Sequence, residues 1–214
     1  MNLVLFGGAG RTGRHVLDLA LQAGHHVVAV VRRPEAVDAD RDGLRVVVSD
    51  VLRPQQWAAD VVGADAVVST LGIGPGIRST TVFSEGARAM LDAMDDAGVR
   101  RIAVVSAPPA EHRSDWGRYG ALRSRVLFPI LDRRFGVSYD DMRRMEAILR
   151  ASDAEWTSYR PPYLSDSARR HPVRTAINAP VPGARRLSRT ELAATMLAGL
   201  TDPTHVRAVV DLAR

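Results

Sequence analysis

Three glycines near the start of the chain stand at a spacing that could cradle phosphate groups. Gly7, Gly10 and Gly13 form the pattern Gly-x-x-Gly-x-x-Gly within GGAGRTG, between an apolar run and a segment with helical periodicity. Glycines let a backbone approach a pyrophosphate closely, and a helix start supplies free N–H groups and the positive end of a dipole. The pattern predicts a dinucleotide site, with Thr12 as a further hydroxyl donor. A purely structural turn is the alternative interpretation.

Two arginines, Arg32 and Arg33, stand at the end of the second apolar run. In a site that prefers NAD, an acidic residue at this place accepts hydrogen bonds from the ribose hydroxyls. A guanidinium group instead binds a 2′-phosphate through paired hydrogen bonds, so this pair favours NADP(H). Arg11, in the glycine turn, could close on the same phosphate. A solvated charge pair is the alternative interpretation.

Further candidate contacts to the cofactor follow other apolar runs. They are Asp50 and Val51 in SDV, Leu71 and Gly72 in TLGIGPG (70–76), and Pro161 in RPPYL. The ends of parallel strands are where ligands of open α/β sheets bind, so together these residues predict one edge of a cofactor site. Each of them alone is equally typical of an ordinary turn.

The elements that must position these residues alternate along the chain. Apolar, β-branched runs predict strands at 2–6, 26–31, 44–48, 65–70, 101–106 and 155–160, with a further strand at 205–212. Helical patterns occupy 11–23, 54–61, 80–97 and 138–151, and Gly98 is a stop signal. Ser188 and Glu191 predict a capping box at the start of a last helix.

This alternation predicts an α/β, Rossmann-type doubly wound fold, with a mostly parallel sheet and helices on both faces. Several strands are continuously apolar, as strands covered on both faces should be. The length of 214 residues suits a single NAD(P)-binding domain, 1–214, with a substrate-side flap at about 107–136. The flap is rich in arginine and aromatic residues, which predicts either a solvated helical cover or a lid that contacts a planar anionic substrate.

Composition excludes several kinds of chemistry. The chain has no cysteine, which excludes disulfides and thiolate catalysis, and all 29 basic residues are arginine, so no lysine can serve as a catalytic base. The net charge is +5, and arginines spread along helix faces favour an anionic cofactor over nucleic acid. There is no candidate membrane span or signal peptide, and no metal site is expected. We expect a cytoplasmic protein. A homodimer is one of its possible oligomeric states.

Five stretches carry a family resemblance, and they are GGAGRTG, SDV, STTVFSEGARAMLDAMDDAGVRRIAVVSA, RRMEAILRASDAEWTSYRPPYLSD and RLSRTELAATML. The chain resembles the atypical short-chain dehydrogenase/reductases with NmrA-like NAD(P)-binding domains, and within them most resembles the biliverdin reductase B/flavin reductase group. The resemblance covers nearly the whole chain except about 108–136. It implies NADP(H) binding and either a reductase or a non-catalytic NADP(H)-sensing regulator.

The chain departs from this family at its catalytic pair. Short-chain dehydrogenases usually combine a tyrosine with a lysine four residues later, whereas YDDMR offers Tyr139 and an arginine. In this family a glutamate stands four residues after the lysine. If Glu146 is that glutamate, Tyr139 falls one position after the place of the catalytic tyrosine. The resemblance instead places Ser106 at the family's catalytic serine, and Tyr163 where the flavin and biliverdin reductases have a histidine. A wall of the nicotinamide pocket is the alternative role for Tyr163, and a bond to the cofactor amide the alternative for Ser106.

The sequence as a whole predicts an NADPH-dependent oxidoreductase that transfers hydride to a planar aromatic or conjugated acceptor, such as a flavin, quinone, bilin or enone. Such acceptors need mainly orientation beside the cofactor, because the cofactor supplies the chemistry. A regulator that binds NADP(H) and a protein partner without turnover is the alternative, and the missing tyrosine–lysine pair favours it.

Overall fold

The fold is built around one large sheet. The computed structural model describes residues 1–73, 79–167 and 171–214, and its eight-stranded sheet has the order β3-β2-β1-β4-β5-β6-β10-β8. Every neighbouring pair is parallel except β10 and β8, which are antiparallel. The seven strands that the sequence predicts are confirmed as β1 (Asn2–Phe6), β2 (His26–Val31), β3 (Leu44–Val48), β4 (Ala66–Ser69), β5 (Arg101–Val105), β6 (Glu155–Arg160) and β10 (Ala208–Ala213).

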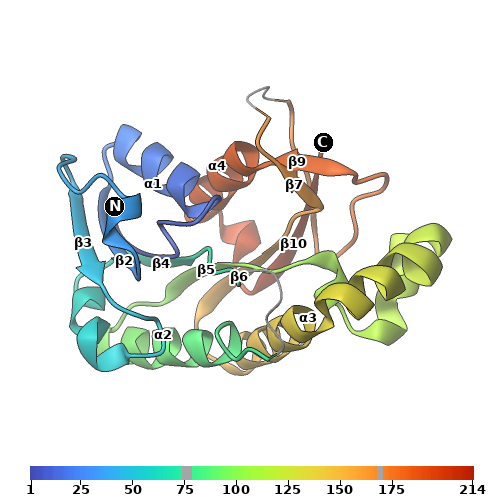
Figure 1. The fold of residues 1–214 in the computed structure, drawn as a ribbon, viewed down its shortest axis with the longest axis horizontal. Coiled ribbons are helices and arrows are strands. Elements are labelled where there is room, and N and C mark those ends of the chain that lie inside the picture. The colour runs from blue at the N-terminus through green and yellow to red at the C-terminus, as the bar shows by residue number, and fades with distance from the viewer. Residues whose placement is uncertain (74–78, 168–170) are drawn as a thin grey trace.

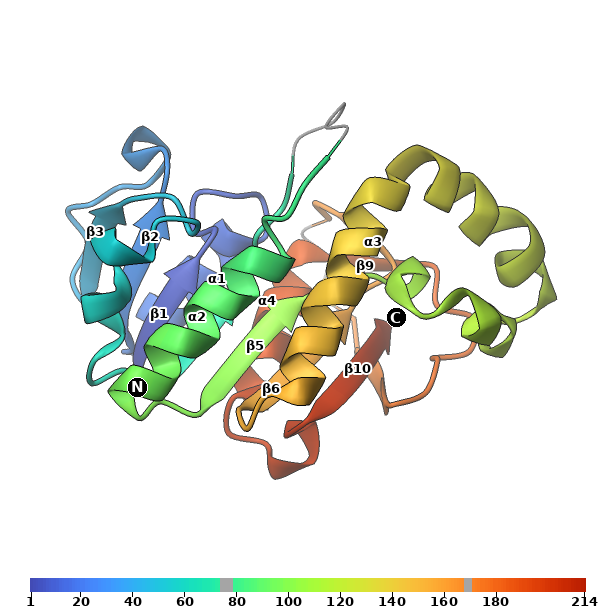
Figure 2. The ribbon, with the colours of Figure 1, turned by 90° about the horizontal axis from the view of Figure 1, so that it is seen from below.

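Helices cover both faces of this sheet, as the continuously apolar strands predict. Helices α1 (Gly13–Gln22) and α4 (Arg189–Gly199) lie on one face, and α2 (Ser84–Ala97) and α3 (Phe128–Ala151) on the other (Figures 1 and 2). Strand β1 shows the consequence, because Leu3 and Leu5 enter the core under α1 and α4, whereas Val4 and Phe6 enter the core under α2 and α3. The doubly wound, mostly parallel fold is therefore confirmed.

The last helix begins where its cap predicts. The backbone N–H of Glu191 donates to Ser188 Oγ at 3.1 Å, and the N–H of Ser188 donates to Glu191 Oε2 at 2.7 Å. Both bonds satisfy donors that a helix start leaves free, so the predicted capping box is confirmed. Earlier in the chain, Gly98 ends α2 with φ +69°, as the sequence also predicts.

Two predicted helices differ from the structure. The segment 54–61 is not one helix but two short 3₁₀ segments, Pro54–Gln56 and Ala58–Val61. At the break, Trp57 has φ −142° and is buried against Phe6, so packing overrides the local pattern. The helix predicted at 138–151 begins ten residues earlier, at Phe128, which packs in the aromatic core of the flap. The proline that follows Phe128 is tolerated because it lies in the first turn, where its missing N–H costs nothing.

Three short strands were not predicted. Strands β7 (Tyr163–Ser165) and β9 (Arg186–Ser188) form a separate parallel pair, and β8 (Arg174–Ile177) joins the edge of the main sheet. They are three or four residues long and largely polar, so their sequences carry no alternation from which to predict a strand.

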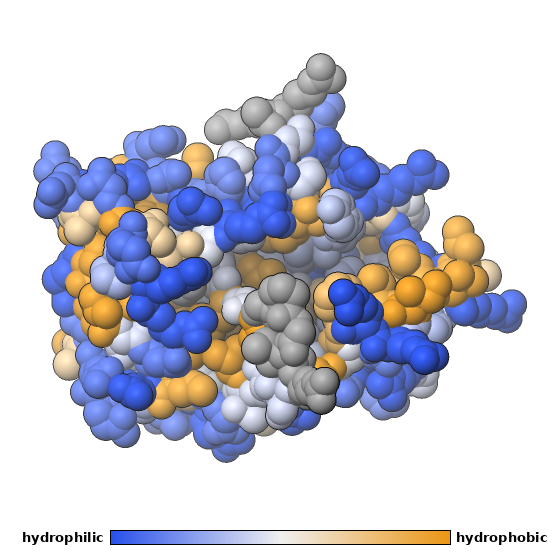
Figure 3. All heavy atoms as spheres, viewed as in Figure 1, coloured by the Kyte–Doolittle hydropathy of each residue, from blue (hydrophilic) through white to orange (hydrophobic). Residues whose placement is uncertain are grey.

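The flap, residues 107–136, has a small core of its own. It contains 3₁₀ segments at Pro108–Ala110 and Arg113–Tyr119 and a π turn at Arg123–Leu127 that leads into α3. Trp116 and Tyr119 pack edge-on against Phe128, with ring centres 5.5 and 5.2 Å away. Its outer side exposes apolar residues, visible to the right in Figure 3. None of the helices among the described residues is long and apolar enough to cross a membrane.

Candidate dinucleotide site

The glycine turn joins β1 to α1 in a conformation that requires glycine. Gly7 has φ +83°, and a Cβ there would lie 2.9 Å from the backbone of Thr70. A Cβ at Gly13 would lie 2.0 Å from the carbonyl oxygen of Gly7, so only glycine lets the helix start pack this closely. Thr12 stands at the N-cap but its hydroxyl makes no capping bond, and the first turn of α1 has no acidic residue. The turn therefore suits an anionic ligand.

A cleft of about 850 Å³ opens beside this turn, at the carboxyl ends of the strands. The face in Figure 3 is hollowed over the middle of the sheet, with apolar residues on the floor of the hollow. Ten of the predicted contacts line the cleft, and they are Gly7, Gly10, Arg11, Thr12, Arg32, Arg33, Asp50, Val51, Leu71 and Gly72. The rest of the predicted stretch TLGIGPG from position 74 on lies outside the described residues.

One end of the cleft carries the arginine pair. Arg32 and Arg33 follow β2 with exposed side chains, and Arg32 Nη1 lies 3.8 Å from Asp50 Oδ2. Asp50 Oδ1 accepts a hydrogen bond of 3.0 Å from the N–H of Leu52, which holds the carboxylate at the end of β3. This end of the cleft therefore presents two guanidinium groups and one acceptor.

The predicted catalytic residues lie next in sequence to residues that line the other end of the cleft. Val105 and Leu164 line it, and each is adjacent in sequence to Ser106 or Tyr163. Ser106 is 3% exposed, and its Oγ has no hydrogen-bond partner among the described residues. Tyr163 is 70% exposed, with the Arg186 guanidinium 5.7 Å from its ring centre. Neither these two residues nor Gly13 and Pro161 belong to the described lining itself.

Tyr139 lies elsewhere. It sits on α3, with its ring 6.3 Å from that of Phe135, and burial raises the pKa of its phenol to about 12. The arginine four residues later, Arg143, forms ion pairs with Asp140 and Asp132. Tyr139 is not among the described residues that line the cleft.

Sequence analysis missed an ion-pair cluster at the mouth of the cleft. Arg11, from the glycine turn, donates to Asp166, which follows β7. Arg189, the first residue of α4, donates to the other oxygen of the same carboxylate at 2.6 Å. Arg11 lies far from the other two residues in the sequence, and the packing of α4 against α1 brings Arg189 close to it. Nothing in the local pattern around Asp166 signals this contact.

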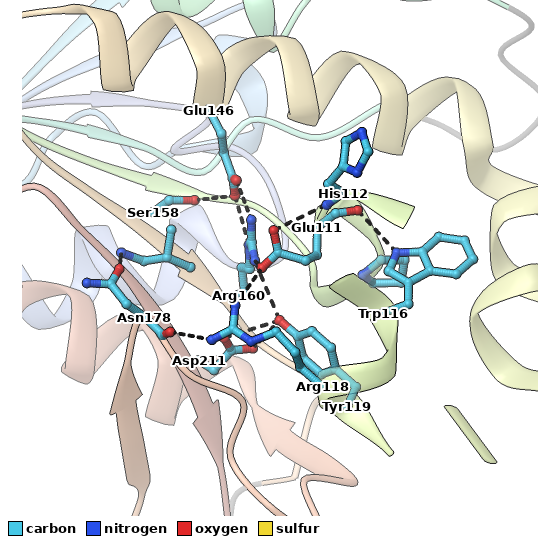
Figure 4. A network of polar contacts seen from close by, with 12 residues as sticks. Glu111, His112, Trp116, Arg118, Tyr119, Glu146, Ser158, Arg160, Asn178 and Asp211 are labelled. Atoms are coloured by element: carbon cyan, nitrogen blue, oxygen red, sulfur yellow. Dashed lines mark hydrogen bonds and ion pairs between the residues drawn. The ribbon is translucent and has the colours of Figure 1, made fainter. Parts of the chain in front are cut away.

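A second cluster that sequence analysis missed is buried at the end of β6 (Figure 4). Arg160, 1% exposed, donates to Glu146 Oε1 at 2.9 Å and to Glu111 Oε2 at 2.6 Å. The Tyr119 hydroxyl donates to Asp211 at 3.2 Å. Burial raises the pKa of Asp211 to about 7, although the charge of Arg160 opposes the shift. The cluster joins the flap, α3, β6 and β10, and it thereby holds the end of β6 from which Pro161 and Tyr163 follow.

A family model described as NAD(P)H-binding matches residues 7–203. A relative described as an "uncharacterized sugar epimerase", YhfK of Bacillus subtilis, is 26% identical over 219 residues, covering 99% of this chain and 94% of that protein.

Solved structures show the same fold. A short-chain dehydrogenase/reductase from Veillonella parvula, in complex with NADP, matches with a TM-score of 0.83 at 14% identity, over 100% of this chain and 94% of that one. ChuY, described as an anaerobillin reductase from Escherichia coli O157:H7, matches with a TM-score of 0.77 at 24% identity, over 100% and 97%. Because the NAD(P)H-binding family model spans nearly its whole length, and solved structures share its fold, the chain belongs to the NAD(P)H-binding family.

Proposed function

We propose that the protein is an NADPH-dependent reductase that transfers hydride to a planar, conjugated acceptor of the flavin, quinone, bilin or enone type. The observation that carries the proposal is the form of the cleft. It runs from the guanidinium groups of Arg32 and Arg33 past the glycine turn to the apolar side chains Val105 and Leu164. A dinucleotide has the same order of parts, with a 2′-phosphate at one end and a flat ring at the other.

The residues of the chain have separate tasks in this proposal. Arg32 and Arg33 bind the 2′-phosphate, and the turn at Gly7 and Gly10 brings backbone N–H groups to the diphosphate. The cofactor supplies the hydride, which carries two electrons, and solvent supplies the proton that completes reduction of the acceptor. Val105 and Leu164 form an apolar wall that keeps water from the reacting rings.

We assign Ser106, the neighbour in sequence of the lining residue Val105, the task of assisting the transfer. Its hydroxyl is buried at the end of β5 and lacks a partner among the described residues, a costly state unless a ligand completes the bond. We assign it a hydrogen bond to the nicotinamide amide or to the oxygen of the acceptor. Orientation carries most of the rate for an acceptor whose ring is already polarised.

The test is NADPH oxidation at 340 nm across a panel of flavins, quinones, bilins and enones, with anaerobic reactions and reactions without protein as controls. We expect at least one planar acceptor to be reduced, with one NADPH consumed for each two-electron reduction. A saturated ketone of similar size serves as the non-planar comparison.

The regulatory alternative rests on the absence of lysine from the chain and on the position of Tyr139 outside the described cleft. It predicts that NADPH binds at micromolar concentration while no acceptor of the panel is reduced above the rate without protein. That pair of results would replace the reductase by an NADP(H) sensor.

A further inference from the structure

Arg11, Asp166 and Arg189 form a cluster at the mouth of the cleft, in which the sequence predicts a binding role only for Arg11, at the 2′-phosphate. Both arginines line the cleft, and both donate to the carboxylate of Asp166. The side chain of Arg189 is 12% exposed, whereas those of Asp166 and Arg11 are 55% and 65% exposed. A nearly buried guanidinium is therefore paired with a carboxylate that stands largely in water.

This asymmetry identifies which partner can leave. Arginine stays protonated, and moving the charge of Arg189 out of its packed place at the start of α4 would disturb the helix. Asp166 needs only a side-chain rotation to reach water, and exposed ion pairs contribute little to stability. The carboxylate thus shows that an oxyanion fits between the two guanidinium groups, and its exposure lets water compete for it.

We propose that Arg11 and Arg189 form an oxyanion-binding subsite of the cleft, which Asp166 covers until a phosphate or carboxylate group of a ligand displaces it. The proposal rests on the proposed function in that the ligand is either the cofactor, through its diphosphate, or an acceptor with an anionic substituent. Paired guanidinium groups bind both oxyanions by the same hydrogen bonds. Asp166 then competes with the anionic group of the ligand and weakens its binding. A neutral ligand gains no affinity from the two guanidinium groups.

The test compares the variants Asp166→Asn and Arg189→Met with the parent protein. Asp18→Asn is the matched control, because Asp18 pairs with Arg41 at 2.6 Å on the surface, and neither residue is among the described lining of the cleft. Dissociation constants are measured by calorimetry for NADPH and, with NADP⁺ bound, for FMN and riboflavin. These two flavins share one ring system and differ by a phosphate.

If the diphosphate occupies the subsite, Asp166→Asn binds NADPH about two- to fivefold more tightly, and Arg189→Met binds it about tenfold more weakly. If an acceptor's anion occupies it, NADPH binding is unchanged, FMN binding shifts in these directions, and riboflavin binding does not. Asp18→Asn is expected to resemble the parent in every measurement.

The proposal is overturned if neither variant changes binding of NADPH or FMN. It is also overturned if Asp166→Asn weakens all ligands together and lowers the melting temperature, since Asp166 would then be a structural link between β7 and the glycine turn. Because these are binding measurements, they separate the subsite from the reductase activity: a panel without turnover rejects the proposed function but leaves the binding result to decide the subsite.

Discussion

At the end of β2, Arg32 and Arg33 stand where a site that prefers NAD has an acid, and Arg32 lies 3.8 Å from Asp50. We expect NADPH to bind at least about tenfold more tightly than NADH, since one charge-assisted hydrogen bond contributes about 1.5–3 kcal/mol. The double change Arg32→Ala and Arg33→Ala is expected to abolish that preference, as measured by calorimetry with both cofactors. Arg100→Ala, before β5 at the opposite end of the sheet, serves as the control. Equal affinities in the parent would exclude the assignment of NADP(H).

Ser106 and Tyr163 offer two hydroxyl groups with different environments. If Ser106 assists protonation, Ser106→Ala loses about 10²–10⁴-fold in kcat with a ketone or enone, but at most about tenfold with a flavin or quinone. Because the Ser106 hydroxyl has no described partner, the same change leaves the melting temperature equal or higher. Tyr163→Phe is measured beside it in single-turnover NADPH oxidation. A fall in stability without a change in rate would mean that Ser106 is structural.

A substitution at Tyr139 tests whether this tyrosine stands outside the family's catalytic position, as the sequence predicts. Its ring packs on Phe135 within α3, and its pKa is raised by burial to about 12, so it is poorly suited to proton transfer at neutral pH. We expect Tyr139→Phe to retain nearly full turnover and cofactor affinity. A loss of about a hundredfold in kcat with unchanged NADPH binding would show that Tyr139 reaches the reaction.

At the scale of elements, the start of α4 is both a structural and an electrostatic feature. Burial alone would raise the pKa of Glu191, but hydrogen bonds from the N–H groups of Ser188 and His171 lower it to about 2. A lowered pKa stabilises the fold above the unfolded value near 4.5, and this stabilisation is lost as the pH falls toward 2.

We therefore expect Ser188→Ala to reduce the free energy of unfolding by about 0.5–2 kcal/mol at pH 7. Glu191→Gln is expected to remove part of the acid sensitivity between about pH 4.5 and 2. Urea unfolding at a series of pH values measures both effects, with Thr201→Ala, two residues beyond the end of α4, as the control. An acid limb identical in the parent and in Glu191→Gln would contradict this role.

At the scale of the whole molecule, the buried cluster around Arg160 joins segments from four parts of the chain. Asp211 is 4% exposed, and burial raises its pKa to about 7, against the opposing charge of Arg160 and together with the nearby carboxylates of Glu111 and Glu146. The folded state then binds the Asp211 proton more tightly than the unfolded state does. Its contribution to stability is complete below about pH 4 and is lost as the pH rises through about 7.

Asp211→Asn keeps a polar side chain of the same size without this titration. We expect the parent to lose about 2–4 kcal/mol of unfolding free energy relative to Asp211→Asn between pH 4 and pH 8. The difference between the two unfolding curves isolates Asp211 from the other carboxylates. A difference that stays constant with pH would show that Asp211 is ionised throughout this range.

Local pattern determined much of this protein. Most of the main strands are runs of apolar, β-branched residues, so consecutive residues indicate their positions. The glycine turn and the Ser188–Glu191 cap are likewise short-range, because their contacts lie within a few residues of each other. These features were predictable, and so was a cleft at the strand ends beside Arg32 and Arg33.

Tertiary structure decided what no local pattern records. Arg11 and Asp166 are 155 positions apart, and only the folded chain brings them within hydrogen-bonding distance. The break at Trp57 and the helix start at Phe128 depend on burial against Phe6 and against the aromatic core of the flap. Arg160 is buried because the distant carboxylates of Glu146 and Glu111 pair with it, and Asp211 accepts a hydrogen bond from the hydroxyl of distant Tyr119. Their roles follow from three-dimensional proximity, which spacing along a chain does not encode.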